Sequence, residues 1–148
     1  LRAVFHPHAD SHVETQQQTY RWLEDTDPDR VGLCLDTGHI EYCGGDSAEI
    51  IRRYPERVEY IHFKQVDPAK MSVVRDKDLG FYDAVQMGAI CEPPGGVPTA
   101  ESIAREMWRL DARIFVIVEQ DLFPCHPDTP FPIALRTASY LRGARIAR

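Results

Sequence analysis

Short apolar runs, separated by segments of mixed polarity, dominate the hydrophobic pattern of this chain. Four runs predict strands, at Ala3–Phe5, Val31–Leu35, Val58–Phe63 and Ile114–Val118. They are rich in Val, Ile and Leu and do not alternate cleanly with polar residues, which is typical of parallel strands covered on both faces. We therefore expect four buried strands of a parallel sheet.

The segments between these runs carry helical signals. Thr15–Glu24 predicts a helix, and Asp46 with Glu49 three residues on resembles the capping box that starts one. Thr99 is expected to cap a third helix, whose apolar residues recur at i, i+4 and i+7, and a last helix is expected after Pro132. Strands that alternate with helices indicate βα units.

One connection between the predicted strands is unusually long. Asp67–Pro98 is rich in Gly and Pro, which favours a functional loop over a linker between domains. The 148 residues contain no repeat and have the length of one ordinary domain, so we interpret residues 1–148 as a single domain.

Composition and charge narrow the classes of protein. The net charge is −6 and Lys and Arg do not cluster, which argues against a nucleic acid partner held by its phosphates. No apolar run approaches the roughly 18–20 residues of a membrane span. No membrane partner is therefore expected. The four cysteines show no CxxC spacing and are too few for a disulfide framework, which favours a cytoplasmic protein.

Chemically capable residues follow every predicted strand. They are His6, His8, Asp10, His12 and Glu14 after the first strand, Asp36 and His39 after the second, His62 and Lys64 at the third, and Glu119 and Asp121 after the fourth. In parallel α/β folds the carboxyl ends of the strands meet where ligands bind. A mixed set of imidazoles and carboxylates suits Mn²⁺, Co²⁺, Zn²⁺ or Fe²⁺, whereas Mg²⁺ prefers oxygen. The pattern predicts a divalent metal site.

Simpler interpretations compete at single positions. An Asp after a strand is commonly a helix cap, and Asp36 could cap a turn at Thr37 and Gly38. A His near a strand end is commonly a hydrogen-bonded packing residue. Glu119 is harder to explain in this way, because a carboxylate directly after the run IFVIV is costly unless it is paired or bound to a metal. The recurrence at four strand ends favours the metal site.

The strings FHPHADSHVET, GLCLDTGHIEYCGGD, YIHFKQVDP, GAICEPPGG and IVEQDLFP, followed by PIALRTASYLR, resemble the sugar isomerase/epimerase superfamily, and within it the inosose dehydratase branch. The resemblance covers nearly the whole chain. It implies an α/β fold in which four βα units form the C-terminal half of a xylose isomerase-like TIM (β/α)8 barrel. Because a complete barrel needs about 250 residues and this chain opens without Met, we expect a fragment of a longer protein or a half that must pair, so a homo-oligomer is one option.

The resemblance also implies a ligand set. Asp36, His62 and Glu119 match the ligands on the last three barrel strands, and His8 falls at the remaining one, with His6 as its rival. The isomerases and epimerases carry a Glu there and use two metal-bound glutamates to transfer a proton, so a His weakens an isomerase assignment. Mn²⁺ or Co²⁺ is the expected cofactor, with Zn²⁺ or Mg²⁺ as alternatives.

The activity implied is that of a carbon–oxygen lyase. An inosose dehydratase removes water from a keto-inositol such as 2-keto-myo-inositol through a metal-stabilised enediolate. Glu119 is the first candidate base and Glu14 the second; His39 or Glu14 would protonate the leaving hydroxyl. Lys64 would hold negative charge on the substrate or form a salt bridge with a nearby carboxylate. Glu14, His39 and Lys64 would contact the substrate.

Other functions share this pattern. A sugar isomerase or epimerase would use the same enediolate without eliminating water, and its partner would again be a small sugar or a cyclic polyol ketone. A metal-dependent endonuclease is disfavoured by the net charge. A fragment without its front half could also be a sugar-binding remnant that has no activity.

Overall fold

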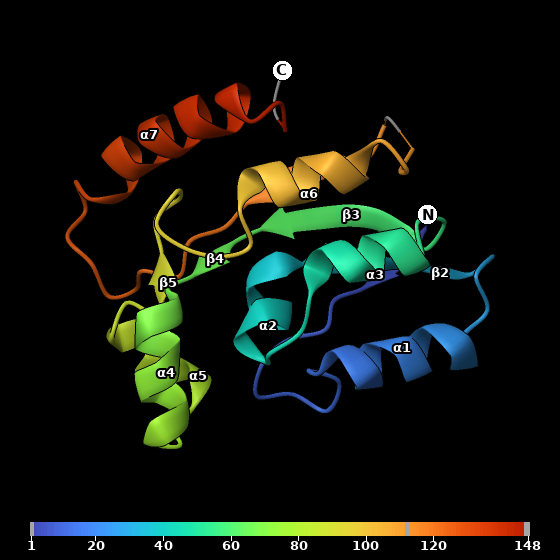
Figure 1. Cartoon of the computed structure of the whole chain (residues 1–148), viewed down its shortest axis with the longest axis horizontal. Helices are drawn as coiled ribbons and strands as arrows, with labels where there is room; N and C mark the ends of the chain where they lie inside the picture. Colours follow the sequence, from blue (N-terminus) through green and yellow to red (C-terminus); the bar gives the residue numbers. More distant parts are fainter. Residues whose placement is uncertain (1, 112, 147–148) are drawn as a thin grey trace.

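A parallel sheet organises the chain (Figure 1). The computed structural model describes residues 2–111 and 113–146. The strands lie in the order β1 (Ala3–Phe5), β2 (Val31–Asp36), β3 (Val58–Phe63) and β6 (Phe115–Val118), and every neighbouring pair is parallel. All four predicted strands are confirmed; β2 runs one residue further, to Asp36, and β6 begins one residue later, at Phe115.

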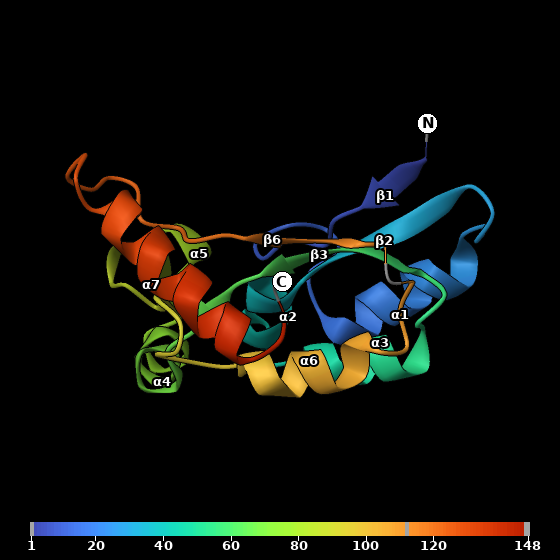
Figure 2. The ribbon, with the colours of Figure 1, turned by 90° about the horizontal axis from the view of Figure 1, so that it is seen from above.

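Helices cover one face of this sheet (Figure 2). They are α1 (Gln16–Asp25), α3 (Ser47–Arg53) and α6 (Ala100–Met107). The predicted caps start them: Thr15, Asp46 and Thr99 each accept a hydrogen bond from the backbone N–H three residues on. Such a side-chain cap stabilises a helix by about 1 kcal/mol, because it satisfies an N–H that has no partner within the helix.

The main apolar core lies between the sheet and these helices. Leu33 and Leu35 on β2, Ile61 on β3, Ile50 on α3 and Ile103 on α6 have no exposed surface. This packing holds β2 and β3 at the centre of the molecule, so their ends are rigidly placed.

The opposite face of the sheet is bare in the part of the chain that the structure describes (Figure 2). On β6, Phe115 is 66%, Ile117 40% and Val118 41% exposed. Val4 on β1 is also 42% exposed. The prediction of strands covered on both faces is therefore wrong for β1 and β6 in the described residues, because the helices pack on one side only.

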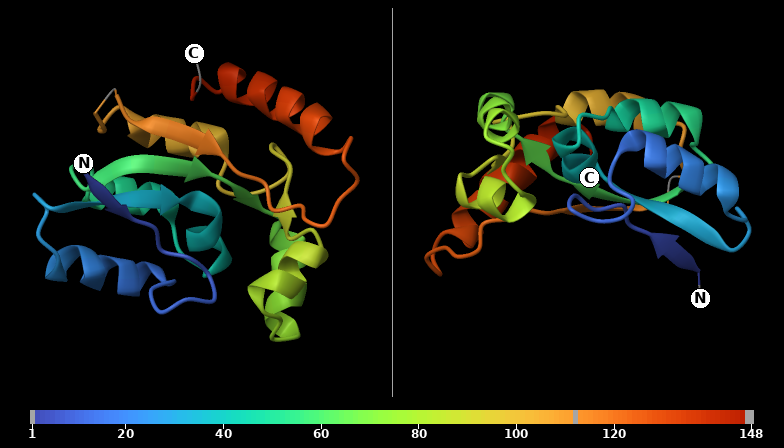
Figure 3. Two further views of the ribbon diagram at one scale, coloured as in Figure 1. Left: turned by 180° about the vertical axis from the view of Figure 1, so that it is seen from behind. Right: turned by 90° about the horizontal axis from the view of Figure 1, so that it is seen from below.

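The long connection from Asp67 to Pro98 is ordered, which corrects the prediction of a loop. It holds α4 (Pro68–Asp76), α5 (Phe81–Gln86) and β5 (Ile90–Cys91), and β5 pairs antiparallel with β4 (Gln65–Val66), which directly precedes the connection. A second apolar cluster, with Met71, Val74 and Ala84 among its members, stabilises this connection. We call Asp67–Pro98, which contains α4 and α5, the excursion. Figure 3 shows α4 and α5 to one side of the main sheet, near the carboxyl ends of its strands.

Two further helices complete the described chain. The six-residue α2 (Thr37–Tyr42) follows β2 directly and was not predicted. The last helix, α7 (Pro130–Gly143), begins two residues before Pro132. Within residues 2–111 and 113–146 no helix has both the length and the hydropathy needed to cross a membrane.

Candidate metal centre

Asp36 is the most buried carboxylate at the strand ends, with 1% of its surface exposed. Its Oδ1 accepts a hydrogen bond of 3.1 Å from the backbone N–H of His39 and so caps α2. Its Oδ2 faces the opposite way and lies 3.4 Å from His6 Nε2, 3.6 Å from His62 Nδ1 and 3.2 Å from Lys64 Nζ. Asp36 can therefore cap α2 with Oδ1 and bind a metal ion with Oδ2, so the two interpretations do not exclude each other.

The charge state of Asp36 follows from these contacts. Burial would raise its pKa, but the contacts with His6 and His62 and the charge of Lys64 overcome that penalty and hold the pKa well below its ordinary value. Asp36 is therefore an anion buried among groups that carry or accept positive charge.

His62 and Glu119 converge on the same space. His62 pairs in register with Asp36 across β2 and β3, and the backbone N–H of Glu119 donates to Phe63 O on β3 at 3.1 Å. His62 Nδ1 lies 3.1 Å from Glu119 Oε1, yet it is buried and makes no hydrogen bond of acceptable geometry. One ligand atom from each of Asp36, His62 and Glu119 lies within 4.8 Å of the others. This donor set fits a divalent cation, because the imidazole nitrogen of His62 has no hydrogen-bond partner and faces two carboxylates.

His6, rather than His8, is the histidine from the first strand that reaches this cluster. His6 forms further compact groups with Asp36 and His39 and with Cys34 and His62. Burial raises the pKa of the Cys34 thiol to about 12, so Cys34 is an uncharged packing group there.

His8 lies in none of the compact groups found among the described residues. Its Nδ1 is 2.7 Å from Ala9 O, and its ring centroid is 3.7 Å from that of His39. Strand geometry explains the difference, because His6 directly follows β1 whereas His8 is already in the loop.

Lys64 is almost fully buried and ties the carboxylates together. Its Nζ lies 3.1 Å from Glu119 Oε2 and 3.0 Å from Asp121 Oδ2, in addition to its contact with Asp36. Burial would lower the pKa of Lys64, but the charges of Asp36 and Asp121 raise it above its ordinary value. The predicted salt bridge of Lys64 is therefore present, and Lys64 is a cation.

Asp121 is the residue of this site that the sequence reasoning left without a role. It stands two positions after Glu119, so in extended chain both side chains point to one side. That spacing was the available signal, and the structure places Asp121 beside Lys64 Nζ.

His39 is buried on α2, and burial lowers its pKa to about 3. It is therefore neutral, and its Nε2 lies 3.3 Å from Lys64 Nζ, from which it can accept a hydrogen bond. A neutral imidazole that accepts from an ammonium group orients that group; it has no proton at Nε2 to give to a leaving hydroxyl.

Glu14 is not brought into the cluster. Its Oε2 accepts a hydrogen bond of 2.7 Å from the backbone N–H of Asp10 within the loop after β1. Gln65, which follows Lys64, is also directed elsewhere: its side chain donates to Pro98 O and accepts from the N–H of Gly96. Gln65 therefore anchors the excursion rather than the site.

The fold and the convergent strand ends define a family. Residues 1–127 match the family model of the xylose isomerase-like TIM barrel, and the chain belongs to this family. The sheet of four parallel strands in chain order supplies half of such a barrel, as the sequence predicts.

Curated relatives narrow the comparison. The chain is 37% identical over 131 residues to the inosose dehydratase of Geobacillus kaustophilus (strain HTA426), which covers 87% of this chain and 42% of that protein. It is 28% identical over 142 residues to inosose dehydratase 2 of Bacillus cereus (strain ZK / E33L), covering 96% of this chain and 47% of that one. The chain thus spans less than half the length of these relatives.

Solved structures share the fold. The probable 3-DHS dehydratase AsbF from Bacillus anthracis superposes with a TM-score of 0.67 at 17% identity, over the whole of this chain and 50% of that one. The IolI protein with a binding zinc atom superposes with a TM-score of 0.61 at 16% identity, over 98% and 47%. At these identities the likeness is one of fold alone.

Proposed function

We propose that this chain carries the metal-binding half of a dehydratase that acts on a keto-inositol such as 2-keto-myo-inositol. One observation supports this most: Asp36, His62 and Glu119 offer ligand atoms within 4.8 Å of one another. The similarity to the inosose dehydratase of Geobacillus kaustophilus supplies the substrate class. The reaction is the loss of water across the bond beside a ketone: a proton leaves the carbon next to the ketone and a hydroxyl leaves the following carbon.

The proposed ligands are Asp36, His62 and Glu119, with His6 in the fourth position. His6 is preferred to His8, the ligand expected from the resemblance, because it contacts Asp36 Oδ2. Mn²⁺ or Co²⁺ suits this mixed set, and Zn²⁺ or Mg²⁺ is the alternative. When bound, the ion supplies Lewis acidity toward the ketone oxygen of the substrate.

The remaining chemistry belongs to the side chains. Glu119 is the proposed base: its side chain is 35% exposed, and a carboxylate oxygen not used as a ligand can take the proton next to the ketone. Lys64 is the proposed cation that holds negative charge on the substrate oxygen as that proton leaves. His39 is proposed to position Lys64. Glu14, the remaining candidate acid, would protonate the leaving hydroxyl so that it departs as water, and it is also the second candidate base.

The first test measures metal content. The chain is purified without chelator, loaded with Mn²⁺ or Co²⁺, and compared with Asp36→Asn by elemental analysis. Asn keeps an oxygen for the cap of α2 but removes the charge, so we expect about one ion per chain in the parent and none in the variant. Asp46→Asn is the matched control, because Asp46 caps α3 away from the site and should keep the ion.

Equal metal content in the parent and in Asp36→Asn would contradict the ligand set. If the ion binds, 2-keto-myo-inositol is supplied and the ultraviolet absorbance is followed. Elimination of water gives a conjugated, absorbing dione, whereas an isomerase or epimerase gives none. Metal binding without turnover would indicate a sugar-binding remnant.

A further inference from the structure

Lys64 faces more acceptors than one ammonium group can satisfy. Its Nζ lies within 3.3 Å of four groups, which are Asp36 Oδ2, Glu119 Oε2, Asp121 Oδ2 and His39 Nε2. An ammonium group has only three N–H donors. The place of the Lys64 charge is therefore set by competition among these four groups, and the loss of one of them strengthens its contacts with the others.

Asp121 differs from the other two carboxylates around Lys64. Asp36 and Glu119 each offer an oxygen to the compact group of possible metal ligands, whereas Asp121 belongs to none of the compact groups found among the described residues. Within residues 2–111 and 113–146, Lys64 is the one cation that pairs with Asp121, at 3.0 Å. Asp121 can therefore keep its contact with Lys64 when an ion takes the other two carboxylates as ligands.

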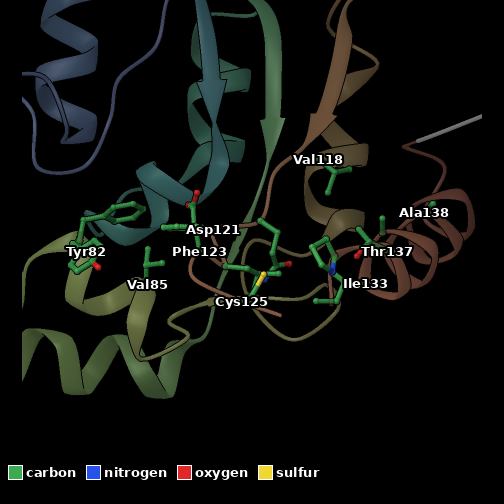
Figure 4. Close-up of a pocket in the computed structure, with 14 residues that line it drawn as sticks. Tyr82, Val85, Val118, Asp121, Phe123, Cys125, Ile133, Thr137 and Ala138 are labelled. Carbon is green, nitrogen blue, oxygen red and sulfur yellow. The ribbon is translucent and has the colours of Figure 1, made fainter. Parts of the chain in front are cut away.

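The surroundings of Asp121 on its other side are mainly apolar. Asp121 borders a pocket of about 720 Å³, with Val118 and Ile133 among the lining residues. Figure 4 shows the Asp121 carboxylate pointing away from these two side chains. Its Oδ2, which faces Lys64 Nζ, is buried and makes no hydrogen bond of acceptable geometry. A buried carboxylate oxygen is costly unless a cation lies beside it, so Asp121 is stabilised by staying with Lys64.

The charge of this cluster is balanced when a dication is present. Three carboxylates and one ammonium group leave two negative charges, with the imidazoles in the neutral form that binds a metal. Asp36 Oδ2, which contacts Lys64 at 3.2 Å, would then be held by the ion, and the ammonium group would be repelled by it. Lys64 needs one anion that the ion does not use, and Asp121 is available for this purpose.

We propose that Asp121 is a positioning residue of the dehydratase site: it holds the Lys64 ammonium group beside the metal centre while Asp36 and Glu119 bind the ion. This role rests on the proposed function, in which Lys64 holds negative charge on the substrate oxygen. Without the charge of Asp121, the ammonium group must share Asp36 and Glu119 with the ion, and it then competes with the ion for their oxygens.

The test is a double-mutant cycle on ion affinity, measured by titration calorimetry with Mn²⁺ near neutral pH. Asp121→Asn should weaken ion binding by about tenfold in the parent chain but by less than about threefold in Lys64→Met, where no ammonium group competes. Asp121→Glu keeps the charge and should retain most of the affinity, whereas a residue needed only for its shape would tolerate Asn better than Glu. The absorption spectrum of bound Co²⁺ should be the same in the parent and in Asp121→Asn, because the proposed ligands are unchanged.

Asp128→Asn is the matched control, because it makes the same charge change in the segment after β6. The Asp128 carboxylate is 93% exposed and lies 3.5 Å from His126 Nδ1, so water and salt screen it and the affinity should stay within about twofold. Circular dichroism checks that each variant folds.

Three results would overturn the role of Asp121 and leave the proposed function standing. They are an unchanged affinity in Asp121→Asn, an equal loss of affinity from this change in the parent and in Lys64→Met or in the Asp128→Asn control, and an altered Co²⁺ spectrum, which would make Asp121 itself a ligand. A parent chain that binds no ion would overturn the proposed function as well.

Discussion

β2 and β6 are apolar runs of the same kind, yet they have opposite surroundings. Leu33 and Leu35 on β2 have no exposed surface, whereas Phe115 and Ile117 on β6 are 66% and 40% exposed. Both strands end in a carboxylate of the proposed metal centre, and these carboxylates differ too: Asp36 is fully buried and Glu119 is 35% exposed. Burial at a strand end therefore depends on the neighbours of the strand, and the proposed site combines one rigid ligand with one accessible base.

We expect the largest loss of stability at Lys64, which joins the carboxylates at the ends of β2 and β6. Lys64→Met leaves the buried Asp36 without its nearest cation, and removing one partner of a buried ion pair costs about 3–5 kcal/mol. Chemical denaturation in chelator should show this loss of unfolding free energy. Adding Mn²⁺ should recover part of it, since a bound cation replaces the missing charge.

Lys70→Met is the control for the change at Lys64. Its Nζ donates to Gly88 O in the α4–α5 excursion, away from the carboxylates, so only a small loss is expected. An unchanged unfolding free energy in Lys64→Met would show that the cluster is stabilised in another way.

Replacing one apolar residue of each strand by Ala compares the burial of β2 and β6 directly. Leu35→Ala should cost about 2–5 kcal/mol, because it leaves a cavity in the main core. Ile117→Ala should cost less than about 1 kcal/mol, because Ile117 is already 40% exposed to water. Denaturant titrations measure both. An equal cost at both positions would contradict the difference in burial between the two strands.

The smallest effect concerns the helices that cover the two strands. Glu106 on α6 accepts hydrogen bonds from Arg109 at 2.9 Å and from Arg52 on α3 at 3.2 Å. These contacts, that of Arg109 foremost, lower its pKa. The stabilisation is thus present above the ordinary Glu pKa of about 4.3 and is lost as the pH falls through the lowered value.

Glu106→Gln tests this pH dependence. At neutral pH the variant should be less stable by under about 1 kcal/mol, since the partners Arg52 and Arg109 are 43% and 37% exposed and water screens their charges. The difference should shrink as the pH falls through the lowered pKa of Glu106, because Glu106 is itself neutral below it. A difference that stays constant across the pH range would mean that packing, and not charge, links the two helices.

The strands and caps were predictable because their signals are local. A run such as Val58–Phe63 marks a strand by itself, and Asp46 caps a helix with a backbone group three residues away. The helix α4 carried such a signal as well, with Asp67 as cap and Pro68 at its first position, but the density of Gly and Pro around it suggested a loop. The helix α2 has only six residues, too few for a periodic pattern.

The sequence pattern predicts that the strand ends form a cluster of polar residues, but it predicts the individual members of the cluster less well. The proposed metal ligands Asp36, His62 and Glu119 converge because register in a parallel sheet aligns the strand ends. The place of Glu14 depends instead on the loop after β1, where Asp10 adopts a φ of 59° and its backbone N–H donates to the Glu14 carboxylate. A left-handed residue redirects the chain, and no strand or helix period encodes it.

The two oxygens of Asp36 have a thermodynamic consequence. One oxygen caps α2 through the amide of His39, and the other faces the proposed cation, so ion occupancy and fraying of α2 are reciprocally linked. Binding of an ion to the carboxylate changes the strength of the cap hydrogen bond, and the cap hydrogen bond in turn changes the affinity for the ion. Hydrogen exchange at the single amide of His39 should therefore report occupancy of the site without any substrate.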